Sequence, residues 1–337
     1  MLLDKITLDK YDSSGMYKVY DNWPKIARES YESDLEPVDF TDIEHIVFVG
    51  MGGSGALGDI FHSILSKTNI HVTITKGYLL PKTVNSKTLL VATSVSGNTI
   101  ELLTALESSL KLQCKRIAFS SGGVLEKFCN NHKIPYRKIP IFQNPRSSFP
   151  AYVYSVLKVL NSILPIDHQS IEESIINLEM ISKKISSENL SETNLSLELA
   201  KWMSDITLIL YPWGLQPVAT RFKNSIQENM KRHAMVEDVI EFCHNGIVAW
   251  EFKSNIKPIL IRGTEDYFKT KERWEIVKEF FDKNNIEYKE VMSLPGNILT
   301  KIINLVYILD YATVYRSVLE GINPHPVKSI DFIKERL

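Results

Sequence analysis

The sequence is poor in cysteine. Its 337 residues include only Cys114, Cys129 and Cys243, which are widely spaced and form no CxxC pattern. A disulfide framework needs closely spaced cysteines in pairs, and a structural zinc site needs paired ligands, so the sequence favours neither. Isolated thiols fit a reducing compartment, and we therefore expect a cytoplasmic protein.

Net charge and long apolar runs are also missing. The formal net charge is −1 and no block of like charges stands out, so neither nucleic acid nor an acidic membrane is expected as a partner. The first ten residues break their apolar positions with charges, unlike a signal peptide, and we expect no run of membrane-spanning length. A composition of 44% hydrophobic and 23% charged residues is typical of a globular protein, and 337 residues are enough for two cores. Because no strongly charged surface is indicated, we expect a small ligand.

The first chemically informative stretch is a strand that runs into glycines. Residues 46–49 are apolar without alternation, and Gly50-Met-Gly-Gly-Ser-Gly follows them. This pattern predicts a buried parallel strand, a tight turn and a helix over about residues 55–67. The N–H groups of such a turn and helix start can bind an anionic oxygen.

The pattern returns about forty residues later. Residues 88–93 form a second apolar stretch, followed by Ser94-Val-Ser-Gly-Asn-Thr99 and a helical pattern that reaches residue 111. Turns that follow parallel strands open at the same edge of their sheet. We therefore expect the two turns to bind one anionic ligand.

Two alternatives exist for these turns. Gly50, Gly52 and Gly55 also match the dinucleotide pattern G-x-G-x-x-G, which requires an acid roughly 20 positions further on. The strand predicted there runs into Lys76 and no acid, which weakens this interpretation without removing it, because lysine can face a 2′-phosphate. Three hydroxyls suit a phosphate monoester better. Alternatively, the serine and threonine of the second turn only cap the helix.

Strands and helices alternate along the whole chain, which predicts an α/β protein with parallel sheets. Residues 1–45 are expected to hold a leading helix packed on the first domain. A boundary is predicted near residues 164–167, followed by a linking helical pair up to about residue 194. The second half repeats the plan, with a strand and turn at 206–214 and at 257–263, a strand at 288–292, and helices at 218–234, 270–283 and 298–319.

The two turns together resemble the sugar isomerase (SIS) domain. Further matches are similar to the archaeal-type bifunctional phosphoglucose/phosphomannose isomerases, and they are Gly214, Ala219, Arg221, Lys223, Glu228-Asn229, Lys231, Ala234, His244-Asn245, Asp310-Tyr311, Tyr315 and residues 321–327. The resemblance implies two tandem SIS-type three-layer α-β-α domains with parallel sheets, residues 1–165 and 166–337. It also implies a set of residues that bind the sugar phosphate, namely Gly53, Ser54, Ser94, Ser96, Thr99 and Lys334.

The resemblance implies an isomerase that interconverts glucose 6-phosphate, fructose 6-phosphate and mannose 6-phosphate through a cis-enediol, in glycolysis or gluconeogenesis. In it, Glu228 is the base, Arg146 stabilises the enediolate, and His244 opens the sugar ring from the other subunit of a homodimer. The chemistry requires no metal and no redox cofactor.

From the residues alone, simpler interpretations stay open. Glu228 lies on one predicted helical stripe with Arg221, Ser225 and Arg232, and could be an exposed partner of Arg232. A single histidine such as His244 is more often a surface or packing residue, and Arg146 could be a solvated loop arginine.

The chain departs from the family pattern at three places, with Gln227 for an asparagine, Gly246 for a glutamate and no threonine within residues 325–327. The change at Gly246 removes a carboxylate that could orient His244. One rival function is a non-catalytic phosphosugar-binding regulatory SIS protein, which would lack the base and the histidine. Another is an amide-transferring glucosamine phosphate synthase, which would need a glutaminase domain or an imine-forming lysine.

Overall fold

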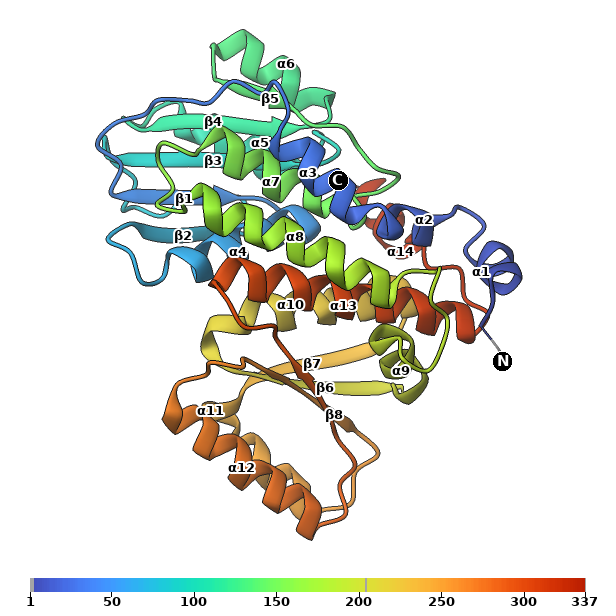
Figure 1. Cartoon of the computed structure of the whole chain (residues 1–337). Helices are drawn as coiled ribbons and strands as arrows, with labels where there is room; N and C mark the ends of the chain where they lie inside the picture. Colours follow the sequence, from blue (N-terminus) through green and yellow to red (C-terminus); the bar gives the residue numbers. More distant parts are fainter. Residues whose placement is uncertain (1–2, 204, 337) are drawn as a thin grey trace. The chain divides into compact units, whose positions relative to one another are not determined.

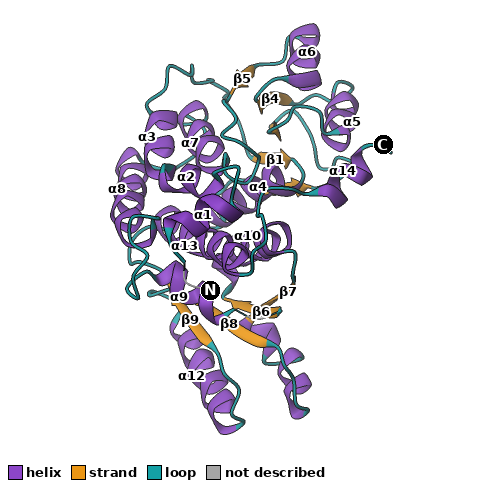
Figure 2. Ribbon diagram, turned by 90° about the vertical axis from the view of Figure 1, so that its right-hand side faces the viewer, coloured by secondary structure: helices purple, strands orange, loops and turns teal. Residues whose placement is uncertain are grey.

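The computed structural model describes residues 3–203 and 205–336. The chain divides into two compact units, each assembled from separate parts of the sequence. The first unit comprises Asn22–Gln169 and Lys328–Leu337, and the second comprises Met1–Asp21 and Ser170–Val327. Figures 1 and 2 show their helices and strands. The change of unit lies close to the boundary predicted near residues 164–167, and the assignment of residues 1–165 and 166–337 to separate SIS domains stays a prediction.

The first unit is built on a five-stranded sheet in the order β2-β1-β3-β4-β5. Its strands are all paired in parallel, and they are β1 (His45–Val49), β2 (His71–Thr75), β3 (Thr88–Ser94), β4 (Lys115–Ser120) and β5 (Tyr136–Lys138). Every residue of β1 and β3 is buried, because helices cover both faces of the sheet.

The two faces of this sheet have separate cores. On one face, Val47 and Leu90 pack with Leu106 of α5 (Ile100–Ser109) and Leu125 of α6 (Gly123–His132). On the other, Phe48 stacks on Phe61 of α4 (Gly52–Leu65), with ring centroids 5.2 Å apart. The remaining helices are α3 (Trp23–Tyr31), α7 (Phe149–Val159) and α14 (Lys328–Lys334).

The second unit contains a four-stranded parallel sheet in the order β7-β6-β8-β9. Its strands are β6 (Ile206–Tyr211), β7 (His233–Asp238), β8 (Lys257–Arg262) and β9 (Lys289–Met292). Leu208 and Leu260 pack with Phe242 of α11 (Val239–Phe242) and Trp274 of α12 (Phe268–Lys283). The opposite side carries α10 (Gln216–Ser225) and the long helix α13 (Ile298–Leu319). The predicted α/β class with two parallel sheets is confirmed.

Helix α13 is apolar over a greater length than we expected of any segment of the chain. By length and composition it could cross a membrane, although we expected no run of that length. In the structure, 89% of its apolar window is buried, which is the environment of a core helix.

The helix predicted over residues 218–234 is confirmed up to Met230 and wrong beyond it. Helix α10 ends at Ser225, a π-helix η2 (Ile226–Met230) follows, and β7 begins at His233. Lys231, between them, has the left-handed φ of 58° that ends the helix. Strand β7 was missed because no Gly, Pro, Asn or Asp separates it from the helix.

The leading segment divides between the units. Helices α1 (Lys5–Tyr11) and α2 (Met16–Asp21) contact α13 of the second unit, whereas α3 packs on α7 of the first. The prediction that the leading segment packs on the first domain therefore holds only for α3. In place of a linking helical pair, there is one helix, α8 (His168–Ile185), followed by α9 (Leu195–Trp202).

Candidate active site

The glycine turn after β1 is tight enough to need its glycines. A Cβ on Gly55 would lie 2.8 Å from the carbonyl oxygen of Gly50, and Gly52 has a positive φ of 53°. Ser54, in the first turn of α4, is buried, and its Oγ accepts a hydrogen bond of 3.2 Å from the N–H of Val95. This bond connects the glycine turn to the turn after β3.

The turn after β3 brings its hydroxyls together at the start of α5. Ser94 Oγ lies 2.8 Å from Thr99 Oγ1 and also accepts the N–H of Gly97 at 3.0 Å. Thr99 occupies the N-cap position, yet its side chain makes no capping bond. Ser96 is exposed, and its Oγ accepts the N–H of Asn98 at 3.3 Å. Helix capping therefore does not explain the threonine, while the first N–H groups of α5 have no acceptor within the helix.

A third turn, after β4, supports the second. The N–H and Oγ of Ser121 donate to the carbonyl oxygen of Val95 at 3.2 and 2.7 Å, and the N–H of Leu125 donates to that of Gly97 at 2.8 Å. Gly97 has a φ of 69°, and a Cβ on it would lie 1.8 Å from the carbonyl oxygen of Gly122. Our sequence reasoning did not single out this support, although the run Ser120-Ser-Gly-Gly after a predicted strand was a usable signal.

Arg146 lies in a loop beside the glycine turn. A Cβ on Gly53 would be 3.6 Å from the carbonyl oxygen of Pro145. The loop is held by the side chain of Asn144, whose Oδ1 accepts the N–H of Arg146 at 3.0 Å. Arg146 is only 5% exposed, so the interpretation as a solvated loop arginine is wrong. A buried guanidinium is a costly group to keep without a role for its charge.

Lys76 and Lys334, the two lysines that the sequence suggested as ligands of a phosphorylated molecule, differ in environment. Lys76, at the end of β2, makes hydrogen bonds of 2.8 and 2.5 Å to the carboxylate oxygens of Asp59 in α4. Its charge is thus compensated within the protein, which further weakens the dinucleotide interpretation. Lys334 is the last residue of α14, which belongs to the first unit, and its side chain is exposed.

In the second unit, Glu228 lies within the π-helix η2 and is half-buried. Lys231 donates from Nζ to the backbone carbonyl of Glu228. Arg232 lies beyond the helix end and forms ion pairs of 3.3 Å with Asp205 and with Glu320. The helix therefore ends before Arg232, so Glu228 and Arg232 do not share one helical face as the simpler interpretation requires.

His244 occupies an exposed turn that follows α11. The backbone N–H of His244 donates to the backbone carbonyl oxygen of Glu241 at 2.8 Å. Two residues later, a Cβ on Gly246 would lie 2.3 Å from Glu237 Oε2 and 2.6 Å from Phe242. The Glu237 carboxylate, at the end of β7, thus occupies the space next to Gly246. Burial, with the nearby charge of Glu241, raises the pKa of Glu237.

Each unit thus carries part of the predicted site. The first unit brings Gly53, Ser54, Ser94, Ser96, Thr99 and Arg146 to the turns that follow β1 and β3 and to the adjoining loop. In the second unit, Glu228 follows β6 and His244 follows β7. Among the described residues, no group of three or more His, Cys, Asp and Glu is arranged to hold a metal.

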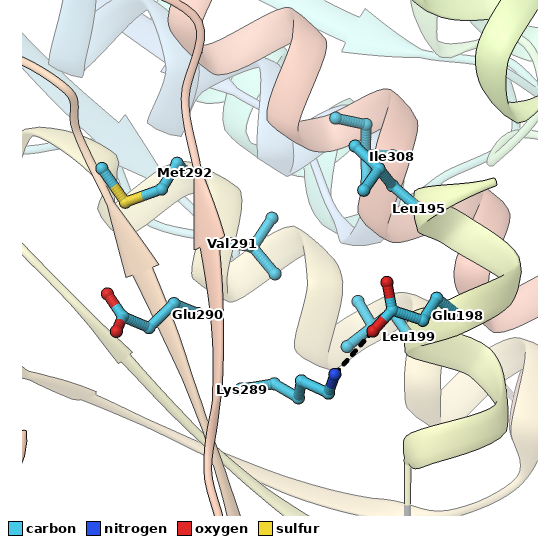
Figure 3. Close-up of a pocket in the computed structure, with 8 residues that line it drawn as sticks. All are labelled: Leu195, Glu198, Leu199, Lys289, Glu290, Val291, Met292 and Ile308. Carbon is cyan, nitrogen blue, oxygen red and sulfur yellow. Dashed lines mark hydrogen bonds and ion pairs between the residues drawn. The ribbon is translucent and has the colours of Figure 1, made fainter. Parts of the chain in front are cut away.

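The second unit also has a pocket that involves none of these residues. Its volume is about 270 Å³, and it lies between α9, β9 and α13 (Figure 3). Lys289 and Glu198 form an ion pair of 2.6 Å at its edge. Most of its remaining lining is apolar: Leu195, Leu199, Val291, Met292 and Ile308.

The chain is similar to known sugar-phosphate isomerases. A family model described as the bacterial phospho-glucose isomerase C-terminal SIS domain matches residues 192–337. A bifunctional phosphoglucose/phosphomannose isomerase of Caldicellulosiruptor bescii is 30% identical over 335 residues, which cover 96% of this chain and 98% of that relative. A relative of the same name from Aquifex aeolicus is 28% identical over 96% of both chains.

The fold has counterparts among solved structures. The tagatose-6-phosphate ketose/aldose isomerase of Escherichia coli superimposes with a TM-score of 0.72 at 14% identity, covering 94% of this chain and 97% of that one. The two parallel sheets therefore fit tandem SIS domains. Together with the match to relatives along nearly their whole length, this shows that the chain belongs to the bifunctional phosphoglucose/phosphomannose isomerase family.

Proposed function

We propose that the protein interconverts glucose 6-phosphate and fructose 6-phosphate, and also mannose 6-phosphate, through a cis-enediol intermediate. The observation that carries this proposal is the match to a bifunctional isomerase along 96% of the chain. This chain also has the three candidate catalytic residues, Glu228, His244 and Arg146. A regulatory phosphosugar-binding protein would have no need of a base and a proton donor.

The phosphate binds at the turn after β3. Support comes from the hydroxyls of Ser94, Ser96 and Thr99 and from the N-terminus of α5. The hydrogen bond from Val95 to Ser54 holds the glycine turn beside them. A phosphate monoester has three oxygens that accept short, charge-assisted hydrogen bonds. Gly53 and Lys334 are the further proposed contacts.

The reaction then needs three groups. His244 delivers a proton to the ring oxygen as the C1–O5 bond breaks, and the C1 hydroxyl loses its proton to solvent, so that the open-chain aldehyde forms. Glu228 takes the proton from C2 of the open-chain aldose and returns it to C1, while a proton moves from O2 to O1, so that the ketose has the same composition as the aldose. Arg146 stabilises the negative charge of the enediolate, which a buried guanidinium does more effectively than a solvated one.

We also propose a homodimer in which His244 serves the site of the other subunit, in the cytoplasm and within glycolysis or gluconeogenesis. Large exposed apolar side chains, Trp213, Tyr267 and Phe268, follow β6 and β8 at their carboxyl ends. Such side chains are frequent in protein interfaces. Light scattering alongside an activity assay tests this, and an active monomer would contradict it.

Incubation of the purified protein with fructose 6-phosphate, followed by NMR identification of the sugars, tests the function. The expected products are glucose 6-phosphate and mannose 6-phosphate. Binding of fructose 6-phosphate without formation of either aldose would favour the regulatory alternative.

A further inference from the structure

The segment that carries Glu228 has an unusual backbone. Residues Ile226–Met230 form the π-helix η2 at the end of α10. A π-helix has wider, i→i+5 hydrogen bonding, and it is rare and usually limited to a single turn, frequently at functional sites. Something outside the helix must therefore favour this turn over a continued α-helix.

A buried ion pair connects α10 with α13, which contact each other in the second unit. Arg221 Nε and Nη2 donate to Asp310 Oδ2 at 2.9 and 2.6 Å, and Ser225 Oγ donates to Asp310 Oδ1 at 2.7 Å. Arg221 is 3% exposed and Asp310 is fully buried. Burial raises the pKa of the Asp310 carboxyl, and the guanidinium and hydroxyl donors oppose that rise.

A second contact reaches the residue next to Glu228. Asn229 Nδ2 donates to Thr313 Oγ1 at 2.7 Å, and Thr313 Oγ1 donates to the backbone carbonyl of Asp310 at 2.6 Å. Asn229 and Thr313 are both fully buried. One turn of α13 thus makes two contacts with this segment. Asp310 binds Ser225 in the last turn of α10, and Thr313 binds Asn229, the residue after Glu228.

A buried ion pair is weak evidence for stability, because desolvation of the two charges offsets much of their attraction. Together with the Asn229–Thr313 hydrogen bond, the ion pair favours one backbone conformation, because any other would leave a buried charge or amide without its partner. That conformation contains the π-helical turn η2.

We propose that Asp310 and Thr313 are positioning residues for the isomerase reaction, which hold η2 in its π-helical form and so set the direction of the Glu228 carboxylate. This rests on the proposed function of Glu228 as the base. Without the contact from Asn229 to Thr313, the turn relaxes toward an α-helix. The side chain of Glu228 then rotates by a large part of the roughly 100° that separates successive helical residues.

The chain offers a matched set of variants on α13. Thr313→Val replaces the bridging hydroxyl by a methyl group of similar size, and Thr313→Ser retains the hydroxyl. Thr300→Val is the control, because Thr300 is fully buried on the same helix and its hydroxyl has no hydrogen-bond partner in the described structure. Steady-state kinetics with fructose 6-phosphate, deuterium exchange into the sugar, and Tm are measured for all three.

Thr313→Val is expected to lower kcat and deuterium exchange by up to about 10²-fold, the effect of a misplacement of roughly 1 Å, with KM within about twofold. Thr313→Ser should retain most of the activity, and Thr300→Val should resemble the unmodified protein. Wild-type kcat in Thr313→Val would overturn the inference, as would equal losses in Thr313→Val and Thr300→Val.

Two further results separate this inference from the proposed function. If the unmodified protein has no isomerase activity, the proposed function fails first, whereas an active protein insensitive to Thr313→Val refutes only the positioning role. Should Thr313→Val not fold, Asn229→Ala removes the same bond from the other side. Wild-type kcat in Asn229→Ala would then overturn the inference, and a selective loss of kcat would support it.

Discussion

Gly97 lies against the carbonyl oxygen of Gly122 so closely that any side chain on Gly97 would displace the turn after β4. The expected distance from a Cβ on Gly97 to that oxygen is 1.8 Å, and the φ of 69° at Gly97 is unfavourable for other residues. The turn that carries Ser94, Ser96 and Thr99 therefore depends on backbone packing between two loops, and not only on its own hydroxyls.

The first prediction concerns this packing. Gly97→Ala should lower the free energy of unfolding by about 2 kcal/mol or more, from left-handed strain and overpacking. It should also raise KM for fructose 6-phosphate, because the hydroxyls move with the turn. Gly77→Ala is the control, since a Cβ there would meet nothing within 4 Å. Equal Tm and KM in the two variants would show that the loops do not constrain each other.

The second prediction concerns Ser96, whose exposed hydroxyl contributes little to the fold. Ser96→Ala should raise KM about 10- to 100-fold, the value of one charge-assisted hydrogen bond of roughly 1.5–3 kcal/mol. Tm should stay unchanged. Ser66→Ala, at an exposed serine that follows α4, should alter neither quantity. An unchanged KM in Ser96→Ala would place the phosphate elsewhere.

The third prediction concerns Gly246. A methyl group there overlaps the Glu237 carboxylate and Phe242, so Gly246→Ala should shift the turn that carries His244. The shift should lower kcat/KM by roughly tenfold or more. Ala249→Ser, at an exposed position three residues further on, is the control. If Gly246→Ala has normal kinetics and Tm, the carboxylate is free to move and does not hold the turn.

The fourth prediction concerns pH and His45, which is buried at the start of β1. Its ring nitrogens lie 3.3 and 2.8 Å from the hydroxyls of Thr88 and Thr73, and its ring is 4.9 Å from that of His71. Burial, together with the charge of His71, lowers the pKa of His45 below 6.5. The unfolded chain then binds a proton that the folded chain does not bind, so stability falls as pH drops through about 6.5.

His45→Gln has no such proton and should lose less Tm than the unmodified protein between about pH 8 and pH 5. His132→Gln, at an exposed histidine of the same unit, should keep the original dependence. The same pH dependence in all three proteins would contradict the role of His45.

Strands and helices could be predicted from the sequence where nearly all of their residues are apolar. Strands β1 and β3 and helix α13 lie within a residue or two of the predicted ranges, because complete burial leaves a continuous apolar signature. Strand β7 could not be recognised, since His233–Asp238 alternates weakly and follows the helix without a turn residue. The π-helix was equally invisible, because it is fixed by Asp310 and Thr313, more than eighty residues away.

The turn that carries the candidate phosphate-binding hydroxyls was predictable from the sequence, whereas the packing that supports it was not. Hydroxyls and glycines at Ser94–Thr99 follow a recognisable strand, so a role in anion binding could be proposed from local pattern. The burial of Arg146 and the contact of Gly97 with Gly122 depend on tertiary packing and have no local signature. The same holds for the contact of the Glu237 carboxylate with Gly246.

The most direct measurement of the central claim is deuterium exchange in Glu228→Gln. The substitution keeps the shape of the side chain but cannot accept a proton, so turnover should fall by about 10²- to 10⁴-fold while substrate affinity hardly changes. Exchange of the C1 or C2 proton of the bound sugar with solvent deuterium should fall equally, whereas Glu272→Gln, on the exposed side of α12, should exchange normally. Wild-type deuterium uptake in Glu228→Gln would contradict the assignment of Glu228 as the base.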